Sequence, residues 1–225
     1  LIVHYCNTLP DKIDVTFKAV VDKTERIRAS SNHTATHLLH QALREILGNH
    51  VEQKGSMVNP RALRFDFSHF SKISKDQISQ IEEFVNSRIK ENLLFEENRN
   101  TLMEKALAEG AIALFGEKYG DTVRTVRFGK SIELCGGTHV ESTSKIWHFK
   151  ITSESAIAAG IRRLEAITGD SCKIFFEEQS NDLEKIKQLI KSPQNIVVAV
   201  ENLQSEIHNL KNEIKNLSEA HLKSL

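Results

Sequence analysis

The sequence has few cysteines and no recognisable secretion signal, and together these absences argue against a secreted, disulfide-stabilised protein. Only three of the 225 residues are cysteine: Cys6, Cys135 and Cys172. A sparse, odd set of cysteines is typical of a reducing compartment, where the thiol serves as a metal ligand or a buried group. We therefore expect a cytoplasmic protein.

Net charge and long apolar runs are also missing. The 30 basic and 30 acidic residues balance, which argues against a protein that grips nucleic acid over a broad basic surface but allows a local basic patch. No apolar run approaches the ~20 residues that a membrane-spanning helix needs. The sequence contains no repeats and begins with Leu1 rather than Met, so we expect a piece of a longer chain that lies outside the membrane.

What is present is a mixture of two periodicities, which predicts an α+β fold. Alternating apolar and polar residues indicate strands, and 3.6-residue stripes between capping residues indicate helices. Strands are expected within residues 1–28 (around Val15, Phe17 and Ala19), at 63–67, in two runs of 122–134 separated by Gly129, and in KITSESAI and IRRLEAIT. Helices are expected at 30–47 (capped by Ser31 or Asn32), 74–91 (Ser74 with Gln77), Thr101 to Gly110 (Thr101 with Glu104), and 171–191.

The last segment differs in kind. Ser192 and Pro193 break the preceding helix, because proline cannot continue it but suits the first turn of a new one. Apolar residues then follow a 4-3 spacing: Ile196, Val200, Leu203, Ile207, Leu210, Ile214 and Leu217. This heptad pattern predicts a long helical arm or coiled coil, through which two copies could pair. The alternative is a single amphipathic helix docked on the body.

The stretch HTATHLLH carries three histidines, His33, His37 and His40, within the helix expected at 30–47. Residues four apart share a helix face, so His33 and His37 could hold one metal ion. His33 and His40 lie about 10.5 Å apart along the axis, too far for one zinc with bonds near 2 Å. The ligand pair is therefore His33 with His37 or His37 with His40, unless the histidines are merely polar surface.

A second stretch, CGGTH, strengthens the metal hypothesis. Cys135 and His139 emerge four residues apart from a turn in which two glycines permit a tight reversal. A thiolate and imidazoles suit zinc, and two histidines from a helix would complete a tetrahedral set. The alternative is a glycine turn with a buried thiol. Thr34 stands where a metalloprotease of the HExxH type carries its general base, so peptidase chemistry is not expected.

At this point five stretches in order, HTATHLLH, VEQKGSMV, LRFDF, CGGTHV and SESAIAAGIRRLEAITG, closely resemble the editing domain of alanyl-tRNA synthetases. The resemblance implies helices packed on an antiparallel sheet around a zinc site, followed by a helical or coiled-coil arm. It implies three parts: residues 1–28 as the end of a preceding β-barrel, 29–169 as the zinc-containing editing domain, and 170–225 as the connector arm. The aminoacylation core of the family is absent.

The resemblance also assigns residues. The family's zinc ligands fall on His33, His37, Cys135 and His139, which leaves His40 as a packing residue or one that supports a ligand. The matching threonines, Thr34 and Thr36, would read the serine hydroxyl, with Ser56 nearby. Gln53 and Arg162 match residues important to editing and are the catalytic candidates, Gln53 to orient water and Arg162 to contact a phosphate of the tRNA end. Without the resemblance, Gln53 would be a solvent-facing strand residue and Arg162 half of a surface ion pair.

The implied activity is hydrolysis of the ester that joins serine or glycine to alanine tRNA, bound by its acceptor end. The alternative is a zinc-stabilised module that binds tRNA or a partner without catalysis, since four protein ligands close a zinc site. One departure is the segment ESTSKIWHF after CGGTHV, where Ser144, Lys145 and Trp147 replace expected small residues. Trp147 would either cover the site or pack beside it.

Overall fold

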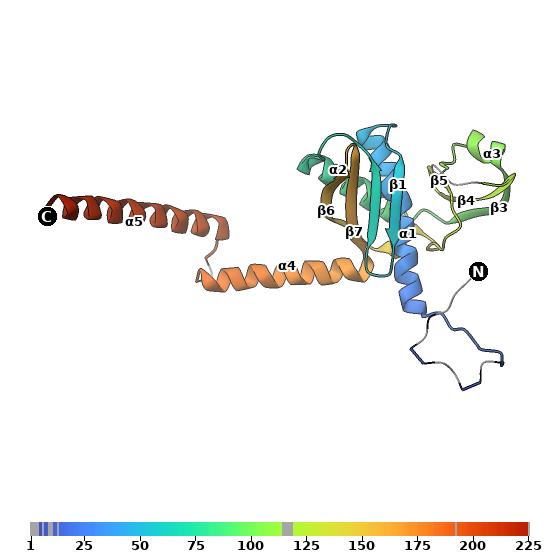
Figure 1. The fold of residues 1–225 in the computed structure, drawn as a ribbon, viewed down its shortest axis with the longest axis horizontal. Coiled ribbons are helices and arrows are strands. Elements are labelled where there is room, and N and C mark those ends of the chain that lie inside the picture. Colours follow the sequence, from blue (N-terminus) through green and yellow to red (C-terminus); the bar gives the residue numbers. More distant parts are fainter. Residues whose placement is uncertain are drawn as a thin grey trace. The chain divides into compact units, whose positions relative to one another are not determined.

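The structure, a computed structural model, describes residues 5, 7–8, 11–12, 14–113, 119–191 and 193–224 (Figure 1). The chain divides into two compact units, Leu1–Gly169 and Asp170–Leu225. In the described part of the chain, no helix is both long and apolar enough to span a membrane.

The first unit is built on a four-stranded antiparallel sheet with the order β1-β2-β7-β6 (Figure 1). Its strands are β1 (Gln53–Val58), β2 (Leu63–Ser68), β6 (Phe149–Ala158) and β7 (Ile161–Thr168). Two helices, α1 (Lys23–Leu47) and α2 (Lys75–Lys90), pack on this sheet and on each other. The covered face carries every second residue of β2, so Phe65 and Phe67 are fully buried there.

A second, three-stranded antiparallel sheet has the order β3-β4-β5. It comprises β3 (Glu96–Leu102), β4 (Thr122–Phe128) and β5 (Ser131–Leu134), with the short helix α3 (Met103–Ala108) between β3 and β4. Gly129 turns β4 into β5 at a φ of 59°, a left-handed conformation that favours glycine. A 3₁₀ turn, η1 (Thr143–Ile146), precedes β6. Most of the predicted elements are therefore present, including both β-runs around Gly129.

The start of α1 corrects two predictions. The helix begins at Lys23, where the Asp22 carboxylate accepts a hydrogen bond from the Glu25 N–H at 2.9 Å, so Ser31 and Asn32 lie inside the helix rather than capping it. No strand forms in the described residues around Val15, which have no partner strand among the described residues. The rest of the strand predicted within residues 1–28 falls partly outside the described residues.

Two capping boxes were predicted, and one is present. Ser74 and Gln77 exchange both hydrogen bonds at the start of α2. Thr101 does not cap α3, because it belongs to β3, where its buried hydroxyl lies 3.4 Å from that of Thr125. Pairing of β3 with β4 therefore takes the place of the capping box predicted for Thr101 and Glu104.

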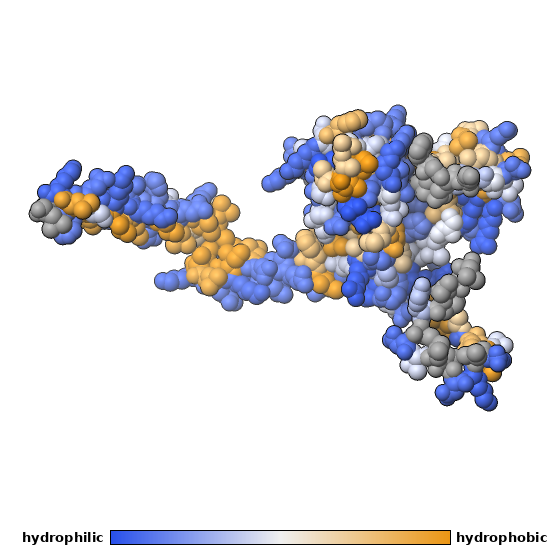
Figure 2. Space-filling model, viewed as in Figure 1, coloured by the Kyte–Doolittle hydropathy of each residue, from blue (hydrophilic) through white to orange (hydrophobic). Residues whose placement is uncertain are grey.

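The second unit holds two helices, α4 (Gly169–Leu189) and α5 (Ile196–Ser224). Pro193 lies between them rather than in the first turn of α5, whose start is capped by the Asn195 side chain at 3.2 Å from the Val198 nitrogen; Ser192 lies outside the described residues. The predicted helix over the heptads is confirmed. Figure 2 shows apolar side chains gathered along one side of α5. Pairing into a coiled coil stays a prediction.

Candidate metal centre

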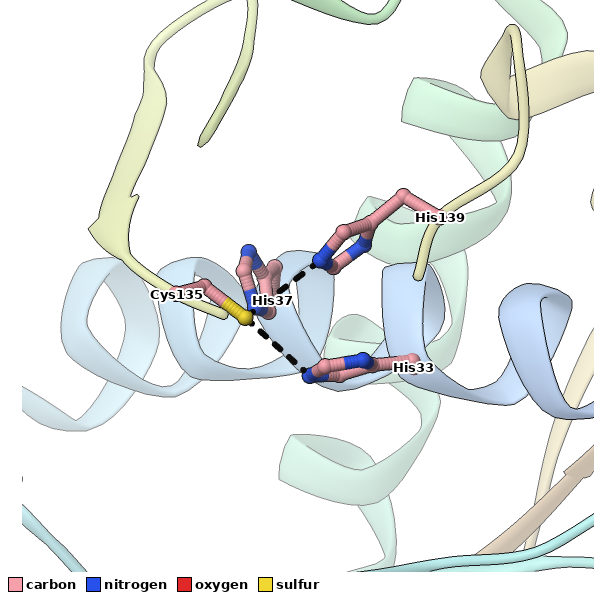
Figure 3. Close-up of side chains that lie close together, drawn as sticks. All are labelled: His33, His37, Cys135 and His139. Carbon is pink, nitrogen blue, oxygen red and sulfur yellow. Dashed lines mark hydrogen bonds between the residues drawn. The ribbon is translucent and has the colours of Figure 1, made fainter. Parts of the chain in front are cut away.

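Four side chains from distant parts of the first unit converge: His33, His37, Cys135 and His139. One donor atom from each lies within 4.8 Å of the other three, and Figure 3 shows the side chains pointing toward one another. The two histidines of α1 occupy one helix face, as their spacing predicts, while Cys135 and His139 come from the turn after β5. His37 is buried and the other three are partly exposed, so the cluster is reachable from solvent.

Two distances within the cluster are close to those between the ligand atoms of a tetrahedral metal ion. Cys135 Sγ lies 3.4 Å from both His33 Nε2 and His139 Nε2. A zinc ion about 2.3 Å from sulfur and about 2.0 Å from nitrogen would separate such atoms by about 3.5 Å. A thiol has a single proton and cannot donate to both rings. The Gly137 N–H also points at Sγ, at 3.4 Å. A thiolate could accept all three contacts, and the thiolate is also the form of cysteine that binds a metal.

The three histidines of the cluster are neutral, so each has a ring-nitrogen lone pair that could bind a cation. Burial, and next the neighbouring His37, lower the pKa of His33 to about 4. Burial also lowers the pKa values of His37 and His139, and His33 and His37 add to the effect on His139. All three imidazoles are therefore neutral near pH 7, the state that metal coordination requires.

Arg124 of β4 holds the backbone of the CGGTH turn by hydrogen bonds, a role that the sequence did not reveal. Its guanidinium Nη1 donates to the carbonyls of Cys135 (2.5 Å) and Gly137 (2.8 Å). Its Nε donates to Glu97 of β3 at 2.6 Å. A strand neighbour thus holds the backbone between two ligands. An arginine within a β-run carries no sequence signal for this role.

Gly137 is required by the approach of α1 to this turn. A Cβ at position 137 would overlap the His33 ring at Nδ1 and Cε1, whereas one at Gly136 would meet nothing within 4 Å. The two glycines of the motif therefore differ in purpose. Gly137 makes room for a ligand.

A buried carboxylate, Glu133 of β5, lies behind the cluster. Its side chain reaches His40 Nδ1 at 3.1 Å and His37 Nε2 at 3.4 Å. Burial opposes charge on Glu133, but His37 and the hydrogen bond from His40 together lower its pKa. Sequence reasoning missed Glu133 too, although alternate strand residues share a face and Glu133 precedes Cys135 by two. His40 is therefore no metal ligand; it contacts this carboxylate and the Phe65 ring.

The two threonines of HTATH make different contacts. Thr34 is fully buried, and its hydroxyl lies 3.1 Å from His139 Nδ1 and 3.2 Å from the Val140 N–H, which donates to it. It thus steadies a ligand of the cluster. Thr36 donates to the carbonyl of Asn32 within its own helix, at 2.9 Å. Recognition of a serine hydroxyl by either residue stays a prediction.

The other predicted site residues lie on the four-stranded sheet. Gln53 donates to Ser56 at 3.2 Å, and Arg162 forms an ion pair with Glu154. Gln53 and Arg162 both pair with Phe67 and so occupy one row across β1, β2 and β7, about 10 Å apart at the usual strand spacing. Thr168, at the other end of β7, bonds Asn32 beside His33, so Arg162 is about 20 Å along the strand from that contact.

Trp147 follows η1 with a φ of 68°, a left-handed conformation that glycine adopts most easily. This explains why a small residue is expected here. The side chain is half exposed, with its ring 5.7 Å from that of His148. The structure thus places it beside η1 with one side in solvent.

Comparison with known proteins gives one family and a consistent set of relatives. Residues 123–165 match the model of the "Threonyl and Alanyl tRNA synthetase second additional domain". The chain is 59% identical to an alanine–tRNA ligase of Christiangramia forsetii over 199 residues, which are 88% of this chain and 23% of that protein. Corresponding proteins of Flavobacterium psychrophilum and Porphyromonas gingivalis are 58% and 49% identical over 89% of the chain, which covers 22% and 23% of them. The chain therefore spans about a quarter of the length of these relatives.

Proposed function

The chain is homologous to a segment of the alanine–tRNA ligases, and from that premise we propose that it hydrolyses the ester joining serine or glycine to alanine tRNA. Serine differs from alanine by one hydroxyl, and an apolar aminoacylation site rejects such a similar amino acid poorly. A second site that recognises the wrong amino acid corrects the error. The proposed substrate is therefore the acceptor end of mischarged alanine tRNA.

One observation carries the proposal. Two histidines of α1, far outside the matched region, meet Cys135 and His139 of that region in a cluster with the donor set and spacing of a zinc site. Three of these residues are partly exposed, which a substrate would need. When bound, zinc supplies positive charge beside the ester, where it would favour developing negative charge or hold the amino acid.

The chain's own residues would do the rest. An aminoacyl ester is already activated, so hydrolysis needs a positioned water and charge stabilisation more than a strong nucleophile. Gln53 shares a sheet row with Arg162, which lies about 20 Å along β7 from the contact beside His33. We therefore propose that Gln53, whose amide donates to Ser56, orients the tRNA end and its ester rather than a water at the cluster. Arg162 would take a phosphate of the tRNA end by exchanging Glu154 for it. Thr34 and Thr36, which lie on the same helix as His33 and His37, would distinguish serine from alanine by recognising the serine hydroxyl.

A second candidate function follows from the ligand count. Four protein ligands close a zinc site and are typical of a structural role. The chain would then be a zinc-stabilised module that binds tRNA without catalysis. This candidate predicts that Gln53 and Arg162 have no effect on ester hydrolysis.

The deciding experiment compares matched serine-, glycine- and alanine-charged alanine tRNA. With the zinc-loaded chain, we expect release of serine and glycine well above the spontaneous rate and slower release of alanine. Gln53→Ala should slow release, whereas Gln80→Ala, at an exposed glutamine of α2, should not. Spontaneous rates with all three tRNAs, in the presence of tRNA binding, would establish the non-catalytic module instead.

Two further assignments belong to the same proposal. A cytoplasmic location follows from cysteine usage. Pairing of two copies through α5 follows from its heptads, whose apolar side chains are exposed in the single chain.

A further inference from the structure

Glu133 is the one buried carboxylate that touches the metal cluster among the described residues, and no step of the proposed hydrolysis uses it. Only 5% of the residue is exposed. Taking a carboxylate out of water costs several kcal/mol unless it is paired and hydrogen-bonded. Its two oxygens are both engaged, one by His40 and one by His37. A group held at such cost beside four metal-binding side chains calls for a role.

Glu133 is the hydrogen-bond partner of the His40 side chain. His40 is 1% exposed, and its Nε2 is buried without a hydrogen-bond partner among the described residues. An ionised carboxylate can only accept hydrogen bonds, so its histidine partner must be the donor. The proton therefore sits on Nδ1, which donates to Glu133 at 3.1 Å. His40 thus holds one oxygen of the carboxylate in place.

The other oxygen faces His37, a ligand of the cluster. A histidine that binds metal through one ring nitrogen commonly donates its second N–H to a carboxylate, which fixes the tautomer and the orientation of the ring. His37 Nε2 lies 3.4 Å from Glu133 Oε2, an ion-pair contact slightly longer than an ordinary hydrogen bond, so the carboxylate is placed beside the ring nitrogen that it would orient. It also has an electrostatic consequence. Three neutral imidazoles and a thiolate leave bound Zn²⁺ with a formal charge of +1, which the Glu133 carboxylate brings to zero.

We propose that Glu133, held by His40, is a positioning residue of the metal centre. It orients His37 and neutralises the buried charge, so both metal affinity and ligand geometry depend on a carboxylate that does not bind the metal. This inference rests on the zinc site of the proposed function. It adds two residues, His40 and Glu133, to the apparatus that retains the ion.

The test compares Glu133→Gln with the unchanged chain in competition against a chromophoric zinc chelator. We expect a loss of zinc affinity of about 10- to 100-fold, the range for removed partners of ligating histidines. The Co²⁺-loaded variant should also show altered ligand-field bands, which report ligand geometry and would not move if Glu133 only stabilised the fold. Asp66→Asn is the matched control, since Asp66 is another buried carboxylate, paired with Arg163 at 2.6 and 2.7 Å. It should lower stability and leave zinc affinity unchanged.

The outcomes separate cleanly. An unchanged chain that binds no zinc contradicts the metal site itself. If Glu133→Gln has the same zinc affinity and the same Co²⁺ spectrum as the unchanged chain, the proposed role of Glu133 is wrong, but the metal site itself is not contradicted. If Glu133→Gln does not fold, His40→Leu decides, because leucine cannot donate a hydrogen bond to the carboxylate. We expect a smaller loss of zinc affinity, and an unchanged affinity would overturn the proposal.

Discussion

At the scale of single residues, the two glycines of CGGTH differ in what surrounds them. A Cβ at Gly136 would meet nothing within 4 Å, whereas the position of a Cβ at Gly137 is already filled by the His33 ring. The need for glycine at position 137 therefore comes from a contact between residues more than 100 positions apart, which only the folded chain reveals.

Alanine substitutions at the two glycines should therefore differ. Gly137→Ala pushes His33 off the cluster, and we expect a loss of zinc affinity of about 10-fold or more, as for other disturbances of ligand orientation. Gly136→Ala should bind zinc as the unchanged chain does. Chelator competition on both variants measures the difference. Equal affinities in the two variants would show that a Cβ at position 137 does not disturb metal binding by His33.

The threonines offer a second matched pair. Thr34→Val leaves two buried groups, His139 Nδ1 and the Val140 N–H, without their shared partner, at a cost of about 1–3 kcal/mol. Thr36→Val removes only a bond to a carbonyl that keeps its own helical hydrogen bond. Urea unfolding of the metal-free chain should show the larger loss for Thr34→Val. The same loss in both would remove the argument that Thr34 steadies His139.

At the scale of elements, local periodicity predicted those elements whose packing agrees with it. The helix stripe around Leu38, the alternation of LRFDF and the box at Ser74 all lie where the sequence places them. The failures are positions where a distant partner competes. Thr101 lies in β3 and pairs with β4 instead of capping α3. Asn32 lies inside α1, where it bonds Asn59 and Thr168, instead of starting the helix. Likewise, motif spacing left the helix pair open between His33 with His37 and His37 with His40, and only the family resemblance selected the four residues that the structure brings together. Arg124 and Glu133 could not be assigned roles without the fold.

Helix α5 carries the prediction of self-association. Its apolar stripe is largely exposed, with Leu210 at 50% and Ile214 at 63%, and pairing with a second copy would bury it. We expect sedimentation equilibrium to give twice the monomer mass for the unchanged chain. Leu210→Glu should give the monomer, whereas Asn209→Glu, next to it on the polar side, should keep the dimer. A monomer for all three proteins would leave α5 as an unpaired helix.

At the scale of the whole molecule, the division into two units separates metal binding from the helical arm. All four donor residues lie in Leu1–Gly169. A ligand that binds only the folded state stabilises it in proportion to the logarithm of its concentration. The stabilisation by zinc should therefore belong to the first unit, while α4 and α5 of the second unit hold no donor of the cluster.

Zinc removal tests this separation, because the single tryptophan, Trp147, lies in the first unit. At a thousand times its dissociation constant, zinc should stabilise that unit by about 4 kcal/mol, which corresponds to a shift in melting temperature of about 10 °C. Chelation of zinc should lower the melting temperature reported by Trp147 fluorescence by that amount. Readdition of zinc should restore it and Mg²⁺ should not, since a thiolate and imidazoles suit softer ions. A fluorescence transition that chelation leaves in place would mean that the cluster adds nothing to the stability of the unit that builds it.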